Sequence, residues 1–463
     1  MANMTTSIKF SDISEDFRFE PKYYLFKEKH KLAKATFSFK PLGELGDKIA
    51  RGQSPKPSTY RKRGQGKYFF IRTADLKRNI LNFQTVVYLE EDTFKTQKSN
   101  RVVADDLLMS VVGNYLGSTV VIPRSISIGT FNDNSARVRV ISSKVSPFWV
   151  SAFLNSKFGQ ELIHSMVTRT GQKILSAGNV KKLEIPIIPN ERFSSRLETC
   201  INRMQVAQNL IYKAFELFAT YLDSPSLIPI YKFSSTFSYI SEGDLWTPRY
   251  SFPQYRRAVL DIENRFKTEH LGSIANIRKG DEVGSDEYIG YIDKKESDIP
   301  FIRTTDIVNF EPDLYPDFFV SKYLYNEKNQ GLQTSEVLFT KDGKIGITGM
   351  ITESDKIILS SGFARISLKS KGLKEGLTPE YLFVALSNPI IGGYQSMQRT
   401  VTASTIPHLR EDRLKEFIIP VFDKTKIKQI TNLIKKANLL KTRIKVDLKA
   451  IKDGIDELFE LKK

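Results

Sequence analysis

The sequence lacks most of the features that mark secreted, membrane-spanning and metal-binding proteins. Its 463 residues include one cysteine, Cys200, so no disulfide can form within the chain. No apolar run approaches the roughly 18 residues that span a bilayer, and the first residues do not follow the plan of a signal peptide. The four histidines are dispersed and show no metal-ligand spacing. We therefore expect a soluble, cytoplasmic protein without a metal site.

Common catalytic motifs are also missing. The chain contains neither the Asn/Asp-Pro-Pro-Tyr/Phe tetrad of an amino-methyltransferase nor a GxxxxGK[ST] phosphate loop. Acidic residues are outnumbered, 52 against 70 Lys and Arg, which gives a formal net charge of +18 and a pI near 9.5. Such an excess favours a polyanionic partner, and nucleic acid is the simplest one. The alternative is a basic surface without a partner.

A repeated phrase divides the chain into two copies of one unit. Residues 70–76 read FIRTADL and residues 301–307 read FIRTTDI. Shifts of about 230 residues also pair Leu42-Gly43 with Leu271-Gly272, Arg51-Gly52 with Lys279-Gly280, Leu108-Met109-Ser110-x-x-Gly113 with Leu338-Phe339-Thr340-x-x-Gly343, Arg169-Thr170 with Arg399-Thr400, and Ile187-Ile188-Pro189 with Ile418-Ile419-Pro420. This period is too long for a solenoid and indicates a duplicated domain.

Each copy predicts a mixed α/β (α+β) domain with a mainly β core. Short apolar runs cut by Gly and Pro predict strands, and helical spacing follows at 147–167 and again at 379–397. We place the domains at 1–190 and 225–422. Two long helices, at 191–224 and 423–463, follow them.

Both long helices carry a heptad seam that asks for a helical partner. The seams run through Leu197, Ile201, Met204, Gln208, Ile211, Phe215, Phe218 and Leu222, and through Ile427, Ile430, Ile434, Ala437, Lys441, Ile444, Leu448, Ile451, Ile455 and Leu458. Pairing of the two helices as an antiparallel coiled coil would relate the domains by a pseudo-two-fold axis. The alternative is two amphipathic helices that each pack on their own domain. Gln208 and Lys441 break the seams and would fix the register, or would lie where the coil is open.

The order domain, long helix, domain, long helix resembles the specificity (S) subunit of type I restriction–modification systems over nearly the whole chain. The matching signals are the FIR-T-x-D phrase, the Leu-Met/Phe-Ser/Thr-x-x-Gly stretch followed by Gly117 or Gly346, and the Ile-Ile-Pro strand before each helix. The family's usual Pro-Pro-Leu-x-x-Gln helix entry is absent, since residues 187–193 read IIPNERF and 418–424 read IIPVFDK.

The resemblance implies a non-catalytic subunit that binds double-stranded DNA. Each domain would read one half of a bipartite, asymmetric target, and the helices would space the halves and dock two DNA adenine methyltransferase subunits. Restriction/translocase subunits are possible further partners. S-adenosylmethionine, ATP and Mg would belong to the partners, and no cofactor to this chain. The alternatives are the recognition portion of a single-chain restriction enzyme, a nuclease in its own right, or a coiled-coil adaptor that binds only protein.

Candidate DNA contacts are polar and cationic side chains in Gly-containing loops, because such side chains reach base edges and phosphates. The set is Tyr60, Arg61, Lys62, Arg63, Lys67, Arg72, Thr73, Asn114, Arg169, Thr170, Gln172, Lys173, Arg303, Thr304, Lys341, Lys344, Arg399, Thr400 and Ser404. The stretch 60–67 is expected to be a flexible, phosphate-seeking loop. For Arg72 an equal alternative is an ion pair with Asp75 inside a structural turn, and the loops at 168–173 and 399–404 could be plain connectors.

The two copies differ sharply in charge near the repeated phrase. Residues 51–78 contain nine Lys and Arg against one acid, whereas residues 278–305 contain five against seven acids. The two domains are therefore expected to make different contacts and to read different half-sites.

Overall fold

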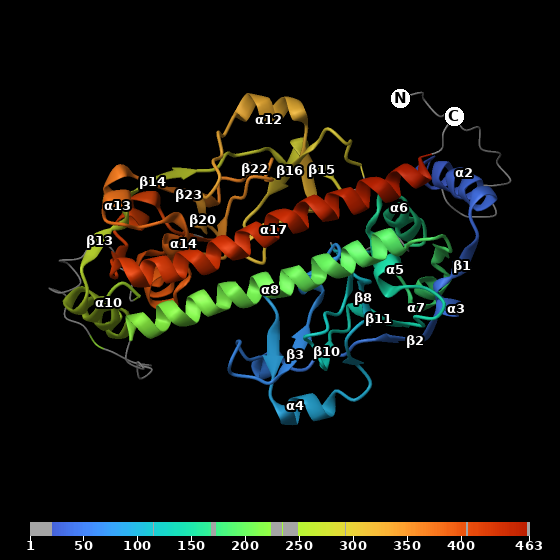
Figure 1. Cartoon of the computed structure of the whole chain (residues 1–463), viewed down its shortest axis with the longest axis horizontal. Coiled ribbons are helices and arrows are strands. Elements are labelled where there is room, and N and C mark those ends of the chain that lie inside the picture. Colours follow the sequence, from blue (N-terminus) through green and yellow to red (C-terminus); the bar gives the residue numbers. More distant parts are fainter. Residues whose placement is uncertain are drawn as a thin grey trace. The chain divides into compact units, whose positions relative to one another are not determined.

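The computed structural model describes residues 21–113, 115–167, 173–223, 234, 249–291, 293–403 and 406–460 (Figure 1). Its contacts divide the chain into two compact units. The first unit comprises Met1–Gln205 and Ile444–Lys463, and the second comprises Val206–Arg443. Each unit thus contains one globular domain and parts of both long helices. Among the described residues, no helix is both long and apolar enough to cross a membrane.

The domain of the first unit is built on two four-stranded sheets. One sheet is antiparallel, in the order β2 (Gly46–Arg51), β11 (Ser135–Val140), β8 (Leu107–Ser110) and β9 (Thr119–Val121). The other has the order β6 (Val87–Leu89), β3 (Tyr68–Ile71), β10 (Gly129–Phe131) and β7 (Arg101–Val102), with β3 and β10 parallel. Short β1 (Phe39–Pro41) pairs with β12 (Glu184–Pro186), and β4 (Leu76–Lys77) pairs with β5 (Ile80–Leu81).

The second unit repeats this plan. Its antiparallel sheet has the order β14 (Ala275–Lys279), β23 (Phe363–Leu368), β20 (Val337–Thr340) and β21 (Thr348–Met350). Its other sheet has the order β15 (Ile289–Gly290), β19 (Phe318–Val320), β16 (Ile299–Ile302) and β22 (Ile358–Leu359), with β16 and β22 parallel. Short β13 (Thr268–His270) pairs with β26 (Ile418–Pro420), and β17 (Ile307–Val308) pairs with β18 (Glu311–Pro312). The predicted mixed α/β duplication is confirmed.

Helices cover the sheets in the same order in both domains. The first domain has α2 (Pro21–Thr36), α3 (Leu42–Leu45), α4 (Glu91–Thr96), α5 (Pro147–Asn155), α6 (Lys157–Ser165) and α7 (Ala177–Lys182). The second has α10 (Pro253–Arg265), α11 (Leu271–Ile274), α12 (Lys322–Lys328), α13 (Ser370–Lys374), α14 (Pro379–Ser387), a π-helical turn (Pro389–Tyr394), α15 (Gln395–Arg399) and α16 (Glu411–Lys415). The hairpin β24 (Val401–Ala403) and β25 (Ile406–His408) follows α15.

The predicted helix over 147–167 is two helices, α5 and α6. The chain breaks at Ser156, which has extended backbone angles and accepts a hydrogen bond from Gly159 N as the N-cap of α6. A Cβ at Gly159 would lie 2.1 Å from the carbonyl oxygen of Phe153. Apolar spacing alone cannot reveal this corner, because both helices bury the same face of the domain.

The two long helices are α8 (Glu191–Leu222) and α17 (Lys424–Phe459), and they pair antiparallel (Figure 1). In the first unit Arg203 near the middle of α8 donates to Asp447 of α17 at 2.7 Å, and Arg196 pairs with the same carboxylate at 3.1 Å. In the second unit Tyr221 at the end of α8 donates to Gln429 near the start of α17. The predicted helix pairing is therefore present.

Most of the seam residues lie inside this pairing, but Leu458, the last residue of the predicted seam, is 40% exposed and its neighbour Phe459 is buried instead. Those predicted for pairing are all buried: Leu197, Ile201, Met204, Gln208, Ile211, Ile430, Ile434, Lys441, Ile444 and Leu448. The same side chains also pack against the domains, since Ile211, Ile430 and Ile434 belong to the large core of the second unit. In the second unit the helices are thus both a pair and a part of the domain's core.

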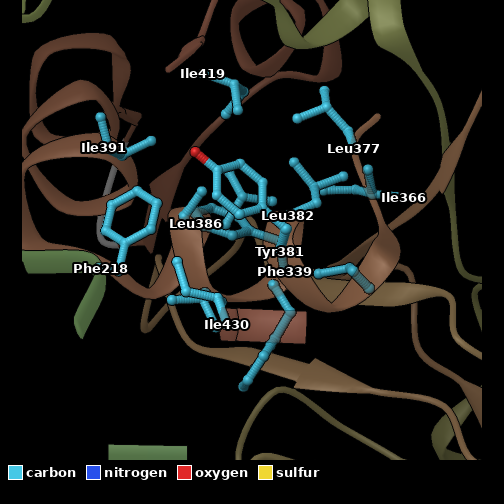
Figure 2. Close-up of a cluster of buried hydrophobic side chains, with 14 of the residues drawn as sticks. Phe218, Phe339, Ile366, Leu377, Tyr381, Leu382, Leu386, Ile391, Ile419 and Ile430 are labelled. Atoms are coloured by element: carbon cyan, nitrogen blue, oxygen red, sulfur yellow. The ribbon is translucent and has the colours of Figure 1, made fainter. Parts of the chain in front are cut away.

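Tyr381 of α14 lies at the centre of the second unit's core, among Phe218, Ile391 and Ile430 (Figure 2). Its hydroxyl donates to the carbonyl oxygen of Pro420 in β26 at 2.7 Å. In the first unit Trp149 of α5 makes the corresponding bond, from Nε1 to the carbonyl oxygen of Pro186 in β12 at 2.9 Å. Each buried aromatic ring therefore keeps a partner for its polar atom.

These bonds correct the predicted alignment of the Ile-Ile-Pro motifs. Pro186 pairs with Phe39 in the same register in which Pro420 pairs with Thr268, so Pro186 corresponds to Pro420. The sequence had matched Pro420 with Pro189, which lies three residues further on. The error arises because residues 184–189 read EIPIIP, in which two Ile-Pro pairs follow each other.

Candidate nucleic-acid interface

One end of the first domain is a set of loops tied together by main-chain hydrogen bonds. The bonds run from Gly52 N to Ser135 O (3.3 Å), Gln53 N to Phe131 O (3.2 Å), Asn132 N to Ile71 O (3.1 Å), Val111 N to Asn134 O (3.0 Å), Leu175 N to Val111 O (2.9 Å) and Gly113 N to Lys173 O (3.3 Å). We call the segments 52–54, 71–75, 111–113, 131–135 and 173–175 the loop end of the first domain.

The second domain makes the same six bonds at corresponding positions. They run from Gly280 N to Phe363 O (3.2 Å), Asp281 N to Leu359 O (3.0 Å), Ser360 N to Ile302 O (2.9 Å), Lys341 N to Gly362 O (2.8 Å), Leu409 N to Lys341 O (2.8 Å) and Gly343 N to Pro407 O (3.0 Å). The loop end of the second domain therefore comprises 280–282, 302–306, 341–343, 359–363 and 407–409. The two loop ends share one backbone framework.

Close backbone contact explains the repeated glycine after β2 and β14. A Cβ at Gly52 would lie 2.1 Å from the carbonyl oxygen of Asn132, and one at Gly280 would lie 2.2 Å from that of Ser360. No side chain fits at either distance. The repeated Arg51-Gly52 and Lys279-Gly280 pairs therefore reflect the framework and not a shared ligand.

The repeated FIR-T-x-D phrase also builds the framework. The Asp75 carboxylate is fully buried and accepts hydrogen bonds from Arg72 N (2.9 Å), Arg72 Nε (3.1 Å) and Thr85 Oγ1 (2.6 Å). Asp306 likewise accepts from Arg303 N and Nε, at 3.0 and 3.1 Å. The structural turn that was one of the two interpretations of Arg72 is the arrangement found. Both arginines stay about one third exposed, so contact with a ligand by the same side chains stays a prediction.

Outside the repeated phrase, the two frameworks carry different side chains at several positions. In the first domain Thr73 Oγ1 bonds with Asn132 Oδ1 (3.2 Å), and Ser54 donates to Asp133 (2.6 Å). In the second, Ser360 and Ser361 stand in place of Asn132 and Asp133. Asp342, which corresponds to Val112, pairs with His408 of β25. The loop ends thus present different donors and acceptors from one scaffold.

The stretch 60–67 is not a flexible loop, contrary to the prediction. Arg61 N donates to Tyr88 O (2.8 Å), Tyr88 N donates back to Arg61 O (2.9 Å), and Lys67 N donates to Leu89 O (3.0 Å). Gly64, at φ +80°, closes the turn. These bonds attach the stretch to the edge of the sheet at β6, and we call residues 60–67 the basic turn.

Side chains of the basic turn are held to different degrees. Tyr60 packs its ring on Phe70 at 5.1 Å, and Arg61 pairs with Glu90 at 2.9 Å. Burial raises the pKa of the Tyr88 hydroxyl, while Arg63, which hydrogen-bonds to it, lowers that pKa. Lys62 and Lys67 are exposed, with the Lys67 ammonium 5.4 Å from the centre of the Tyr68 ring. The two lysines are therefore best placed to meet a phosphate.

Three predicted contact residues have partners within the domain: Lys341 and Thr400 are buried, and Arg399 is half-buried. The Lys341 side chain is 6% exposed and lies 3.3 Å from Asp342 and 3.4 Å from Glu411. Arg399 is 14% exposed and pairs with Glu416 at 3.1 Å, and Thr400 donates to Ser396 O at 2.7 Å. All three side chains have partners within the domain, and contact of these residues with DNA stays a prediction. The sequence could not show their acidic partners, which lie up to 70 residues away.

Other candidates lie at the loop ends or outside the described residues. Lys173 and Lys344 are exposed, and Thr304 lies beside Gly362, where a Cβ would approach its methyl group to 2.7 Å. Asn114, Arg169, Thr170, Gln172 and Ser404 lie outside the described residues. The sequence reasoning missed Gln53, Ser54, Asn132, Asp133, Ser360 and Ser361. Their signal was the polar runs QSPK, FNDN and SSG after apolar strands.

Within the part of the chain that the structure describes, no group of three or more His, Cys, Asp and Glu side chains could hold a metal ion. The interface is instead a surface of hydrogen-bonding groups with cations beside it. Such a composition suits DNA, where side chains read base edges and Lys or Arg contact phosphates.

Comparison with known proteins identifies the second copy. Residues 263–450 match the family model of the type I restriction modification DNA specificity domain. No curated protein matches the sequence.

Several solved structures align with almost the whole chain at low identity. The S subunit of a type I restriction–modification system from M. genitalium is 13% identical, with 92% of this chain and 95% of that chain covered and a TM-score of 0.37. A chain from a structure that concerns complex assembly and conformational transition of the type I R-M system is 14% identical. The alignment covers 91% of this chain and 97% of that chain, with a TM-score of 0.29. The HsdS subunit from Thermoanaerobacter tengcongensis is 12% identical, with coverages of 91% and 96% and a TM-score of 0.29.

The identification rests on the family model and the duplication together. The model covers the second domain and most of α17. The first domain repeats the strand order and the hydrogen-bond framework of that matched domain. Residues 263–450 therefore match the DNA specificity domain of type I restriction–modification systems, and the first domain repeats the architecture of that matched domain.

Proposed function

We propose that each domain reads one half of a split double-stranded DNA sequence through its loop end, and that the chain itself catalyses no reaction. The observation that carries this proposal is the shared framework with different side chains. A common scaffold would place both sets of side chains against DNA in the same way, and the different side chains would select different bases.

The exposed groups suit the two tasks of DNA binding. Asp133 and Gln53 in the first domain, and Asp281, Ser360 and Ser361 in the second, offer donors and acceptors for base edges. Lys62 and Lys67 supply phosphate contacts that fix orientation without reading sequence. The net charge of +18 supports a polyanionic partner for the chain as a whole.

We further propose that the paired helices dock two DNA adenine methyltransferase subunits, with restriction/translocase subunits as additional partners. These partners would bind S-adenosylmethionine, ATP and Mg and would flip the target adenine out of the duplex. What supports this is the family match and the missing catalytic motifs of this chain.

Selection from random DNA tests the reading function directly. The purified full chain is incubated with linear duplexes that carry a randomised segment of about 30 base pairs, a length that exceeds two half-sites and a gap. After several rounds at moderate salt, two short defined segments separated by one fixed gap should be enriched. Enrichment of one continuous site, or of no sequence at all, would contradict the proposal.

A further inference from the structure

The hairpin β17–β18 of the second unit has an unusual turn. Its two turn residues, Asn309 and Phe310, both have positive φ, at 53° and 65°. Asparagine tolerates this conformation, but a bulky aromatic residue rarely adopts it. A turn of this kind persists where surrounding contacts determine it.

Both long helices supply those contacts. Gln208 of α8 donates from Nε2 to the carbonyl oxygen of Asn309 at 3.4 Å, and Lys441 of α17 donates from Nζ to that of Phe310 at 3.4 Å. The Lys441 ammonium also lies 4.0 Å from the Glu311 carboxylate. All of these residues belong to the second unit.

The ring of Phe310 packs into the same place. Its centroid lies 5.3 Å from that of Phe215 and 6.0 Å from that of Tyr212, both on α8, and 5.9 Å from that of Phe383 in α14. The strained turn is thus inserted between the helix pair and the domain core. Its two carbonyl oxygens accept hydrogen bonds from the two polar residues of the seams.

Gln208 and Lys441 occupy corresponding positions of the two heptad seams. Each follows three apolar seam positions with the spacing 4-3-4, after Leu197, Ile201 and Met204 in α8 and after Ile430, Ile434 and Ala437 in α17. They are 2% and 1% exposed. An apolar residue would pair the helices better at such positions. If the two polar side chains only fixed the register of the helix pair, they would not both need to bond to the same turn of the domain.

The hairpin connects this turn to the loop end of the second domain. Asp306, which ends the FIRTTD phrase, lies directly before β17, and Asp313 N after β18 donates back to Asp306 O at 2.8 Å. Only the two residues of each strand, β17 and β18, therefore separate the anchored loop end from the turn held by the helices. In the first domain the corresponding Asn79 is held differently, because its Oδ1 accepts from Ser151 and Asn155 of α5 at 2.9 and 2.8 Å.

We infer that Gln208 and Lys441 are positioning residues that fix the second domain on the helix pair, so that its loop end meets DNA at one distance from the first half-site. The inference rests on the proposed function. The two residues select the length of the unread gap, while the loop ends select the bases on either side of it.

Gap selectivity is the readout that a purely structural role would not change. The selection from random duplexes is repeated with the full chain carrying Lys441→Met, Gln208→Leu or both changes. The wild-type chain should prefer one gap over its neighbours by about tenfold, the usual effect of one misplaced base pair. The double variant should enrich the same two segments but accept gaps one base pair longer or shorter with a preference below about threefold.

Two further variants separate positioning from folding. Lys436→Met makes the same chemical change at an exposed position of α17 and should keep the wild-type gap. Lys441→Gln keeps a donor for the Phe310 carbonyl without the charge and should restore most of the selectivity. If Lys441→Met does not fold, Gln208→Leu alone carries the test, because it removes the bond to the Asn309 carbonyl. A double variant with an unchanged single gap, or with altered half-site sequences, would overturn the inference. A wild-type chain that enriches no split site would overturn the proposed function, and the inference with it.

Discussion

Asp75 and Asp306 give the physical reason for the phrase that the chain writes twice. Each carboxylate is buried at the end of the short turn that follows a central strand. It holds this turn by accepting hydrogen bonds from the backbone and side chain of the arginine three residues before it. Removal of one partner from a buried ion pair leaves the other uncompensated. The acid of the phrase is therefore required by folding, whatever the arginine contacts on its exposed side.

Asp75→Asn should accordingly destabilise the first domain by about 2 to 3 kcal/mol, because Arg72 and Thr85 lose a charged acceptor. The measurement is the urea midpoint of the full chain, followed by circular dichroism. Asp133→Asn is the matched control, since this exposed carboxylate accepts a hydrogen bond from the exposed Ser54, and it should shift stability by less than about 0.5 kcal/mol. Equal midpoints for the two variants would contradict the structural role of Asp75.

Cys200 allows a prediction about reactivity. Burial, together with the smaller effect of the nearby Asp447 carboxylate, raises the pKa of its thiol to about 12. A raised pKa keeps the thiol protonated, so at pH 8 roughly one molecule in 10⁴ carries the reactive thiolate. Ellman's reagent should therefore leave the native chain unmodified at pH 8 and release one equivalent of thionitrobenzoate in 6 M guanidinium, about the concentration that unfolds most proteins. Rapid reaction of the native chain would show that α8 and α17 separate at this point.

Residues could be assigned from sequence where a strict period determined them. Every residue predicted for helix pairing is buried, because the heptad spacing admits one packing face. The candidate DNA contacts were less predictable. Lys341 and Arg399 looked like free loop cations, but their acidic partners approach only through the tertiary fold.

At the scale of elements, the basic turn is the clearest departure from sequence reasoning. Its glycines and charges suggested mobility, whereas the bonds to Tyr88 and Leu89 fix it on the sheet edge. Because the turn is fixed, its lysines are held near one place before DNA binds. Binding then costs less conformational entropy. Sequence composition cannot distinguish a mobile loop from a turn whose main chain pairs with a strand 27 residues away.

The basic turn should therefore contribute phosphate contacts without sequence preference. Replacing Lys62 and Lys67 together by Ala should weaken binding to all duplexes and reduce the slope of log K against log salt by roughly two, about one per lost contact. Fluorescence anisotropy with a labelled random duplex at several salt concentrations measures this slope. Lys435→Ala, an exposed change on α17, should leave it unaltered. A double variant with the wild-type slope would place the basic turn away from DNA.

At the scale of the whole chain, the duplication carries most of the function. The sequence revealed two copies and two paired helices, since both rest on periodicity. It could not reveal that the two domains share one hydrogen-bond framework, because main-chain bonds leave little trace in side-chain identity. Gly52 and Gly280 are the exceptions, where a carbonyl oxygen excludes every side chain.

The shared framework predicts that the domains can be exchanged independently. The positions that Asn132 and Asp133 occupy in the first domain are taken by Ser360 and Ser361 on an equivalent backbone in the second. The two half-sites should therefore differ, and the target should not be a palindrome. Replacing residues 1–190 by the first domain of a related specificity subunit should change one half-site and preserve the other half-site and the gap. The second domain and its attachment through Gln208 and Lys441 remain intact in such a chimera. Methylome sequencing of cells that express the chimera with its methyltransferase measures both halves at once. A chimera that alters both halves would mean that the domains read DNA jointly, and the two-reader mechanism would then be wrong even for a tightly binding chain.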